Sequence, residues 1–389
     1  MMWYFISTFV YGILSALDPL LFVFIAYTLN NVSGVYMGVL SAAWSIVYII
    51  ANKFLGSLAD DGHNKLLCVI TLICVSVIAY FFNSINYVIG FLIYILHAVA
   101  IASLNLAINV TILESFDSDF WNKMTLYNRV ANNIVRGATL IMASMFGATL
   151  IVNLFHAVLL GAAISGFLMP SLIMSFERRF YKLNKMLDRI GHYIKASSSL
   201  LYLDKPKTAL DVFMKVWNSA ENISSIRVLI TTAGAVAVGD YIFTVIPLVL
   251  KSKIILTDMW KVYGVAAVAS ALISFLLRNT DFSSRFLAFS LFLLRLAVLV
   301  MGFNLVSNVT YLVLYILTTS TIFMLLDSTL YNIYIEARSG FGTSTYFIFR
   351  ELGSVIGSLL GGLAISLGPY QFLAIVLAMG LATSVPLIL

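Results

Sequence analysis

Residues 56–65 form a charged turn between two long apolar runs and read Gly-Ser-Leu-Ala-Asp-Asp-Gly-His-Asn-Lys. Such a turn is unusual here, because only 10% of the 389 residues are charged. Hydrophobic residues make up 61% of the chain, and its mean hydropathy is +1.00. A water-soluble domain of this size cannot hide so many apolar side chains, since its surface must stay polar. The composition therefore predicts an all-α polytopic membrane protein.

The apolar runs are each long enough to cross a hydrocarbon core of about 30 Å as a helix. Twelve spans are predicted, at residues 3–29, 35–55, 66–82, 87–113, 122–150, 155–175, 223–248, 259–277, 285–303, 310–335, 343–366 and 370–389. The first has no basic segment before it, so we interpret it as a span and not as a cleaved signal. We expect three parts: an N-terminal six-helix bundle at 1–175, a linker at 176–222 and a C-terminal six-helix bundle at 223–389.

Basic residues indicate the orientation in the membrane. Of the 23 Lys and Arg residues, 18 fall on the side that carries the connections after the even-numbered spans. Basic residues near span ends are retained in the cytoplasm, so we expect a multi-pass protein of the cell membrane with both termini cytoplasmic. The linker places basic residues around an apolar helical stripe, which predicts an amphipathic helix on the cytoplasmic leaflet. The net charge of +6 follows from this asymmetry and does not indicate nucleic-acid binding.

Residues 56–65 resemble the loop between helices 2 and 3 of the major facilitator superfamily of membrane transporters. The family pattern is Gly-x-Leu-Ala-Asp-Arg-x-Gly-Arg-Arg/Lys, and the matching residues are Gly56, Leu58, Ala59, Asp60 and Lys65. The chain departs from the pattern at three places. Asp61 replaces the first Arg, Gly62 comes one place early, and Asn64 replaces a later Arg.

The two halves of the chain resemble each other at an offset of 222 residues. The pairs at this offset are Gly12 with Gly234, Asp18 with Asp240, Asn105 with Asp327 and Glu114 with Glu336, while Arg129 and Arg350 are 221 apart. Major facilitator transporters are built as a six-plus-six repeat, with the substrate site near the midplane between the halves. The resemblance thus covers the whole chain and implies that fold, with two pseudo-symmetric six-helix halves.

Ionisable residues deep inside predicted spans are candidates for function, because a charge at bilayer depth costs about 2.5–3.5 kcal/mol on insertion scales. Asp18 and Arg136 lie at similar depths in the spans at 3–29 and 122–150. Helices 1 and 5 are neighbours in the family, so the resemblance implies that Asp18 and Arg136 meet.

Asp240 is the repeat counterpart of Asp18, but Gly357 stands where the matching arginine would be. Without a fixed cation, desolvation favours the neutral form of a carboxyl, which suits a proton-coupling site. We therefore interpret Asp240 as the protonatable group. Arg295 is assigned a structural role, because its span belongs to the outer ring in the family. Neutralisation of Asp240 or Asp327 by Arg295 is the alternative.

Polar residues on two further spans complete the predicted substrate site. Asn105 and Asn109 lie four residues apart on one helix face, and Asp327 and Tyr331 occupy the equivalent repeat positions. In the family, helices 1, 4, 7 and 10 line the central cavity, so the resemblance implies that these four residues contact substrate. Hydrogen bonding between helices is the alternative for the asparagines.

Charged residues at the cytoplasmic span ends are interpreted as a gate. The resemblance implies a latch between the helix 2–3 loop, the end of helix 4 and the start of helix 11. Opening such a latch must break contacts between carboxylates and guanidinium groups. Solvated surface charges are the alternative. The predicted gate residues are Gly56, Asp60, Lys65, Glu114, Arg129, Glu336, Arg350 and Glu351.

We find no motif for nucleotide hydrolysis, zinc catalysis or a catalytic nucleophile, so neither an enzyme nor a cofactor or metal site is expected. Gly353, Gly357, Gly361 and Gly362 are interpreted as a close-packing helix face. The resemblance implies a monomeric secondary active transporter that works by alternating access in the lipid bilayer, with protons as the coupling ion.

The substrate is expected to be a small molecule. Efflux of drug-like or cationic amphipathic compounds is slightly favoured, because acidic residues and aromatic-rich spans suit such molecules. Proton-coupled uptake of an organic acid or a sugar is the alternative, and an unpaired Arg136 facing the cavity would favour an anion. A non-transporting membrane sensor or a lipid scramblase on the same scaffold is an alternative of another class.

Overall fold

The computed structural model describes residues 2–115, 118–170, 225–276, 284–306, 308–337 and 343–387, and these are almost entirely helical. The first half contains α1 (Met2–Thr28), α2 (Gly34–Asp60), α3 (Asn64–Phe81), η1 (Phe82–Ser84), α4 (Tyr87–Ser115), α5 (Ser118–Phe146) and α6 (Ala148–Leu168). The second half contains α9 (Ser225–Phe243), α10 (Ile246–Leu250), α11 (Leu256–Leu276), α12 (Arg285–Leu305), α13 (Val309–Ala337), α14 (Thr343–Ala364), η2 (Ile365–Leu367), α15 (Pro369–Ser384) and η3 (Val385–Leu387).

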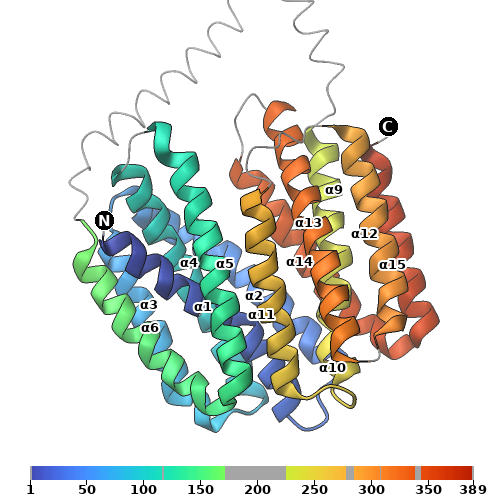
Figure 1. The fold of residues 1–389 in the computed structure, drawn as a ribbon, viewed down its shortest axis with the longest axis horizontal. Helices are drawn as coiled ribbons and strands as arrows, with labels where there is room; N and C mark the ends of the chain where they lie inside the picture. The colour runs from blue at the N-terminus through green and yellow to red at the C-terminus, as the bar shows by residue number, and fades with distance from the viewer. Residues whose placement is uncertain are drawn as a thin grey trace, which may run out of the picture.

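These helices form two bundles, and both chain ends lie at the same end of the molecule (Figure 1). We call this the terminal end, and we call the end that carries residues 29–33 and 251–255 the opposite end. The predicted twelve-helix architecture with two six-helix halves is confirmed. The exact division at 1–175 and 223–389 stays a prediction, because the linker at 176–222 lies outside the described residues.

Eleven helical segments of the described chain are long and apolar enough to cross a membrane. The predicted span at 122–150 is not among them and corresponds to α5. This helix carries Arg136 together with Asn128, Asn132 and Asn133. Because α5 packs against α1 and α11, its polar groups lie inside the protein. The opposite face of α5 carries exposed apolar residues such as Met142 and Met145.

Span ends differ from the prediction by several residues, and two places have a clear physical cause. Helix α5 ends at Phe146 and α6 begins at Ala148, so the connection is Gly147 alone. Gly147 has φ of +70°, a left-handed conformation that glycine adopts without steric cost. The predicted span at 223–248 is broken after Phe243. Pro247 has no N–H to donate to the Phe243 carbonyl, which explains the break three residues after Asp240.

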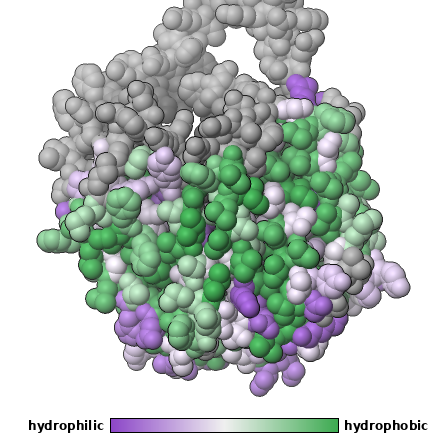
Figure 2. Space-filling model, in the orientation of Figure 1, coloured by the Kyte–Doolittle hydropathy of each residue, from purple (hydrophilic) through white to green (hydrophobic). Residues whose placement is uncertain are grey.

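The outer surface of the bundle is apolar. Large side chains such as Phe54, Tyr80 and Phe167 are more than two-thirds exposed. On the face shown in Figure 2, apolar residues cover the middle of the molecule, and hydrophilic residues gather at the opposite end. Lipid is the solvent that such a surface fits, since exposed apolar area on this scale is unfavourable in water.

The two halves contact each other through α2 with α14 and through α5 with α11. Glycines bring the backbones close at both contacts. A Cβ on Gly38 would lie 2.6 Å from the Ser358 carbonyl oxygen, and a Cβ on Gly264 would lie 2.9 Å from that of Gly137. All of these residues lie between mid-span and the opposite end. The backbone approach therefore places a tight seam between the halves in that part of the molecule.

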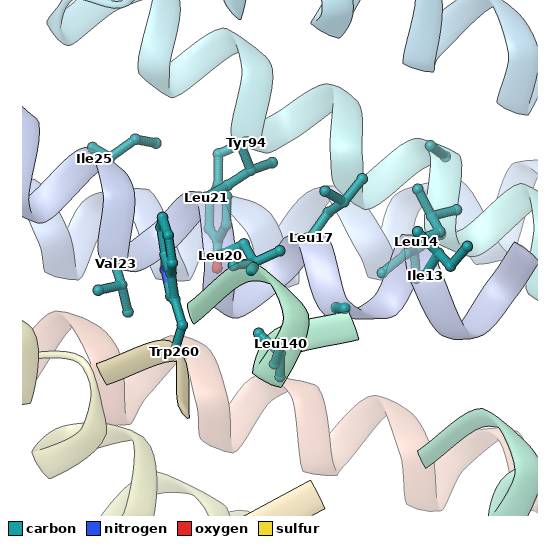
Figure 3. Packing of buried hydrophobic residues seen from close by; sticks show 14 of the residues in the cluster. Ile13, Leu14, Leu17, Leu20, Leu21, Val23, Ile25, Tyr94, Leu140 and Trp260 are labelled. Atoms are coloured by element: carbon teal, nitrogen blue, oxygen red, sulfur yellow. The ribbon is translucent and has the colours of Figure 1, made fainter. Parts of the chain in front are cut away.

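Apolar packing follows the same pattern. Trp260 of α11 is fully buried and belongs to one hydrophobic cluster with Leu20 and Val23 of α1 (Figure 3). A second cluster contains residues of the second half only, including Leu229, Phe292 and Leu330. The halves thus share a core toward the opposite end, while the second half has a core of its own toward the terminal end.

The predicted close-packing face of α14 is confirmed. A Cβ on its glycines would collide with the backbone of α9 or, for one glycine, of α2. The contacts with α9 are Gly353 with Ala233, Gly357 with Ala237 and Gly361 with Tyr241, and Gly362 meets Gly34 and Gly38 of α2.

We expect Gly357→Ala to lower the thermal unfolding temperature in detergent. The added methyl group must push α14 away from α9, and overpacking of this kind costs about 1–3 kcal/mol. The matched control is Gly56→Ala, because nothing lies within 4 Å of a Cβ at Gly56. Equal unfolding temperatures for the two variants would contradict the packing.

Candidate functional site

Asp18 lies inside α1, bonded to α4 and one turn from a hydrogen-bonded group of α2 and α4. The Tyr94 hydroxyl donates to Asp18 Oδ1 at 2.6 Å. One turn away, the His97 ring contacts the Leu14 carbonyl through Nε2 at 2.9 Å and accepts from Trp44 Nε1 through Nδ1 at 3.2 Å. Because indole N–H only donates, Nδ1 is the acceptor and Nε2 carries the proton. His97 is thus a satisfied, neutral, buried histidine.

Arg136 of α5 is half-buried and has no hydrogen-bond or ion-pair partner in the described structure. It lies within electrostatic range of Tyr11, Tyr94 and Tyr263, which belong to α1, α4 and α11. Its guanidinium therefore lies within electrostatic range of tyrosines from both halves of the protein. The expected ion pair with Asp18 is not seen among the described residues, and Asp18 accepts a hydrogen bond from Tyr94.

Asp327 of α13 makes the ion pair of the second half. Its Oδ2 lies 3.4 Å from Arg350 Nη1, and its Oδ1 accepts from the Tyr346 hydroxyl at 2.9 Å. Arg350 was predicted as a gate residue at the membrane face. The structure places it seven residues into α14, where it pairs with Asp327, and its gating role stays a prediction.

Asp240 of α9 and Glu351 of α14 lie at the seam with α2. The Asp240 carboxyl lies beside Ser354, and the Glu351 carboxyl lies beside Ser45. Ser45 Oγ donates to Ser354 Oγ at 3.0 Å. Two carboxyl groups therefore lie beside a serine–serine hydrogen bond that joins the two halves.

Arg295 reaches from α12 toward the interior and is 5% exposed. Its guanidinium donates to the Ala235 carbonyl and lies 4.1 Å from the centre of the Phe323 ring. It occupies the space that a side chain at Gly239 would need. The structure describes no ion pair between Arg295 and Asp240 or Asp327, although Arg295 lies within electrostatic range of Asp240, so its role stays a prediction.

The remaining substrate candidates have local partners. Asn109 Nδ2 donates to Asn105 Oδ1 at 3.0 Å, so the two asparagines share one face of α4 as expected. Tyr331 packs edge-on against Tyr346, with ring centroids 5.2 Å apart. Tyr331 thus lies next to the residue that bonds Asp327.

The predicted gate at the terminal end is only partly described. Lys65 is exposed, and the space around Gly56 is open. The side chains of four further candidates lie outside the described residues: Asp60, Glu114, Arg129 and Glu336. The gate therefore stays a prediction.

A contact at the opposite end was not predicted. Lys251, which follows α10, donates to the Ala26 and Leu29 carbonyls at 2.9 and 3.2 Å. The Tyr27 hydroxyl donates to the Ile254 carbonyl at 2.8 Å. A cation at the C-terminal end of α1 also interacts favourably with the helix dipole. These bonds fasten the two halves together at the opposite end.

Lys251→Met is expected to loosen this contact. Charge-assisted hydrogen bonds contribute about 1.5–3 kcal/mol when buried, and the exposure of Lys251 reduces that value, so we expect an effect of about fivefold. The measurement is the labelling rate of a Ser41→Cys reporter in the α2–α14 seam with a membrane-impermeant thiol reagent. Lys253→Met is the control, since Lys253 lies on the same loop. Identical rates for all three proteins would exclude this role of Lys251.

The fold matches those of solved transporters. No family model and no curated protein matches the sequence. A mutant of the nucleoside transporter NupG is similar with a TM-score of 0.62 and 15% identity, over 100% of this chain and 98% of that one. A mutant of the peptide transporter POT, solved with sulfate, is similar with a TM-score of 0.65 and 11% identity, over 100% and 92%. A D-xylose–proton symporter is similar with a TM-score of 0.64 and 12% identity, over 99% and 96%.

All three are major facilitator transporters, and each match covers both halves of the chain. The chain therefore has the major facilitator superfamily fold.

Proposed function

We propose that this protein is a secondary active transporter that moves a small molecule by alternating access and couples its movement to protons. The observation that carries the proposal is the set of carboxyl groups deep in the helices of both halves, namely Asp18, Asp240, Asp327 and Glu351. Buried carboxyls are costly in a membrane and mark ion or proton pathways. The solved relatives in fold transport a nucleoside, a peptide and, with a proton, D-xylose.

The arrangement of the halves supports alternating access. Hydrogen bonds cross between them at the opposite end, from Lys251 and Tyr27, and along the seam from Ser41 to Ser358 at 2.9 Å. Basic residues assign the terminal end to the cytoplasm. The structure then corresponds to the state that is closed toward the outside. Rocking of the halves would open this seam and close the terminal end.

The carboxyl pair at the seam supplies a physical link between protons and this motion. Asp240 and Glu351 lie beside the bonded serines that join α2 to α14. Glu351 lies beside Ser45 of the other half, so a change in its protonation alters a contact that joins the two halves, and we infer that the protonated form favours the closed seam. Loss of that proton to the other side of the membrane would favour opening. Arg350 and Arg295 are the cations within electrostatic range of Asp240.

The proposal is tested with purified protein in proteoliposomes. A thermal-shift screen of metabolites and drugs selects a ligand, since a compound that binds the native state raises its apparent stability. Counterflow of that ligand is then measured, together with ligand-driven acidification of the vesicle interior, which a trapped pH dye reports. We expect to observe counterflow and acidification. A ligand that binds without exchange would instead indicate a membrane sensor, and exchange without acidification would exclude proton coupling.

A further inference from the structure

We propose that the substrate is an aromatic carboxylate whose carboxylate group binds Arg136. This inference rests on the transport function proposed above and names its substrate class. It replaces the cationic compounds that composition alone slightly favoured. Three features of the structure carry it: the unpaired guanidinium, the occupied carboxyl groups and the aromatic side chains around them.

The first feature is the free cation. Arg136 Nε is fully buried without a hydrogen-bond partner, and no carboxylate pairs with the guanidinium in the described structure. A guanidinium at this depth carries a desolvation cost that a bound anion removes. It presents a planar fork of N–H donors that matches the two oxygens of a carboxylate.

The second feature is that the nearby carboxyl groups have other contacts. Tyr94 bonds Asp18, while Arg350 and Tyr346 bond Asp327. Asp240 and Glu351 lie beside the seam serines and within electrostatic range of Arg350. The group left without a partner is thus a cation. Because Arg136 supplies one positive charge, a monoanion balances it better than a phosphate dianion does.

The third feature is the aromatic lining of the same region. Trp44 and Tyr48 of α2 are stacked, with ring centroids 5.3 Å apart and planes 6° apart. Trp44 also contacts Tyr94, with centroids 6.3 Å apart, and Tyr94 lies within electrostatic range of Arg136. Ring faces of this kind pair well with an aromatic or unsaturated body. The Arg136 guanidinium therefore lies within electrostatic range of this aromatic surface.

The test uses three probes with the same benzoylamide body and different end groups. Hippurate ends in a carboxylate, N-benzoylethylenediamine in an ammonium group and N-benzoylethanolamine in a neutral hydroxyl. We expect hippurate to raise the unfolding temperature at about tenfold lower concentration than the other two, a difference of ~1.4 kcal/mol. Arg136→Gln should remove the hippurate shift, and Arg136→Lys should retain part of it. Lys253→Gln, which changes a surface cation, should leave it unchanged.

Three results would overturn the inference. The amine could stabilise the protein more than hippurate does, no probe could bind, or the hippurate shift could survive in Arg136→Gln. Counterflow of radiolabelled hippurate separates it from the proposed function. Hippurate that binds through Arg136 but does not exchange supports the anion site and contradicts transport. Exchange of the amine in place of hippurate supports transport and contradicts the anion site.

Discussion

Replacing Asp240 with asparagine is expected to abolish accumulation driven by a pH gradient, with a loss of about tenfold or more, while ligand exchange continues. Asparagine keeps the size and hydrogen bonding of a protonated carboxyl but cannot release a proton. The contact with Ser354 is retained, so the α2–α14 seam still closes. Exchange requires no net proton movement and should survive. The measurement compares gradient-driven uptake with counterflow in the same proteoliposomes.

Asp258→Asn is the matched control, because Asp258 lies in the first turn of α11 at the opposite end. This control variant should change neither gradient-driven uptake nor counterflow. Gradient-driven uptake of normal size and pH dependence in Asp240→Asn would remove Asp240 from the coupling mechanism. Loss of exchange together with uptake would show that Asp240 binds the substrate.

Gly362→Leu is expected to stop transport by preventing closure of the seam. A side chain at Gly362 would occupy the space of the Gly34 carbonyl and of the Gly38 Cα, which lies 2.8 Å from an added Cβ. Backbone atoms cannot move aside as a flexible side chain can, so the halves must separate at this end. The Ser41→Cys reporter should then react rapidly, and counterflow should fall about tenfold or more.

The control for this wedge is Leu363→Phe. Leu363 is the next residue along α14 and is 53% exposed, so added bulk there faces away from the seam. It should transport normally. A Gly362→Leu variant that exchanges ligand at the normal rate would show that the tight α2–α14 seam is not part of the transport cycle.

The fold could be predicted from the sequence because membranes restrict it so strongly. Apolar runs of sufficient length, the loop at residues 56–65 and the repeat pair Asp18 and Asp240 together predicted twelve helices in two halves. The glycine face of α14 was predictable for the same reason, since helices in lipid approach closely where side chains are small. Span ends were predicted less accurately. The turn between α5 and α6 consists of Gly147 alone, and no extended polar segment in the sequence marks it.

The sequence predicted which residues belong to the site but not which of them contact each other. Depth in a span identified Asp18, Arg136, Asp240 and Asp327. Their pairing depends on helix rotation and on residues distant in sequence, such as Tyr94 for Asp18. Arg350 shows the same limit, since its distance from a span end indicated a gate residue while packing directs it to Asp327.

One signal for the seam was present in the sequence. Ser41 and Ser45 lie four residues apart in α2, and Ser354 and Ser358 lie four apart in α14. Each such pair forms a polar stripe along one helix face. The stripes meet as Ser41 with Ser358 and Ser45 with Ser354, in the antiparallel order of the two helices. Matching of polar stripes between helices of the two halves could therefore have located this contact.

Spin-label distances at both ends of one protein test the proposed alternation between two states most directly. One pair replaces the exposed residues Ser57 of α2 and Leu276 of α11 at the terminal end. The other replaces Tyr80 of α3 and Tyr370 of α15 at the opposite end, which are 79% and 86% exposed. When pH is raised or hippurate is added, we expect one distance to lengthen as the other shortens. Distances that never change, or that change in the same direction, would contradict alternating access.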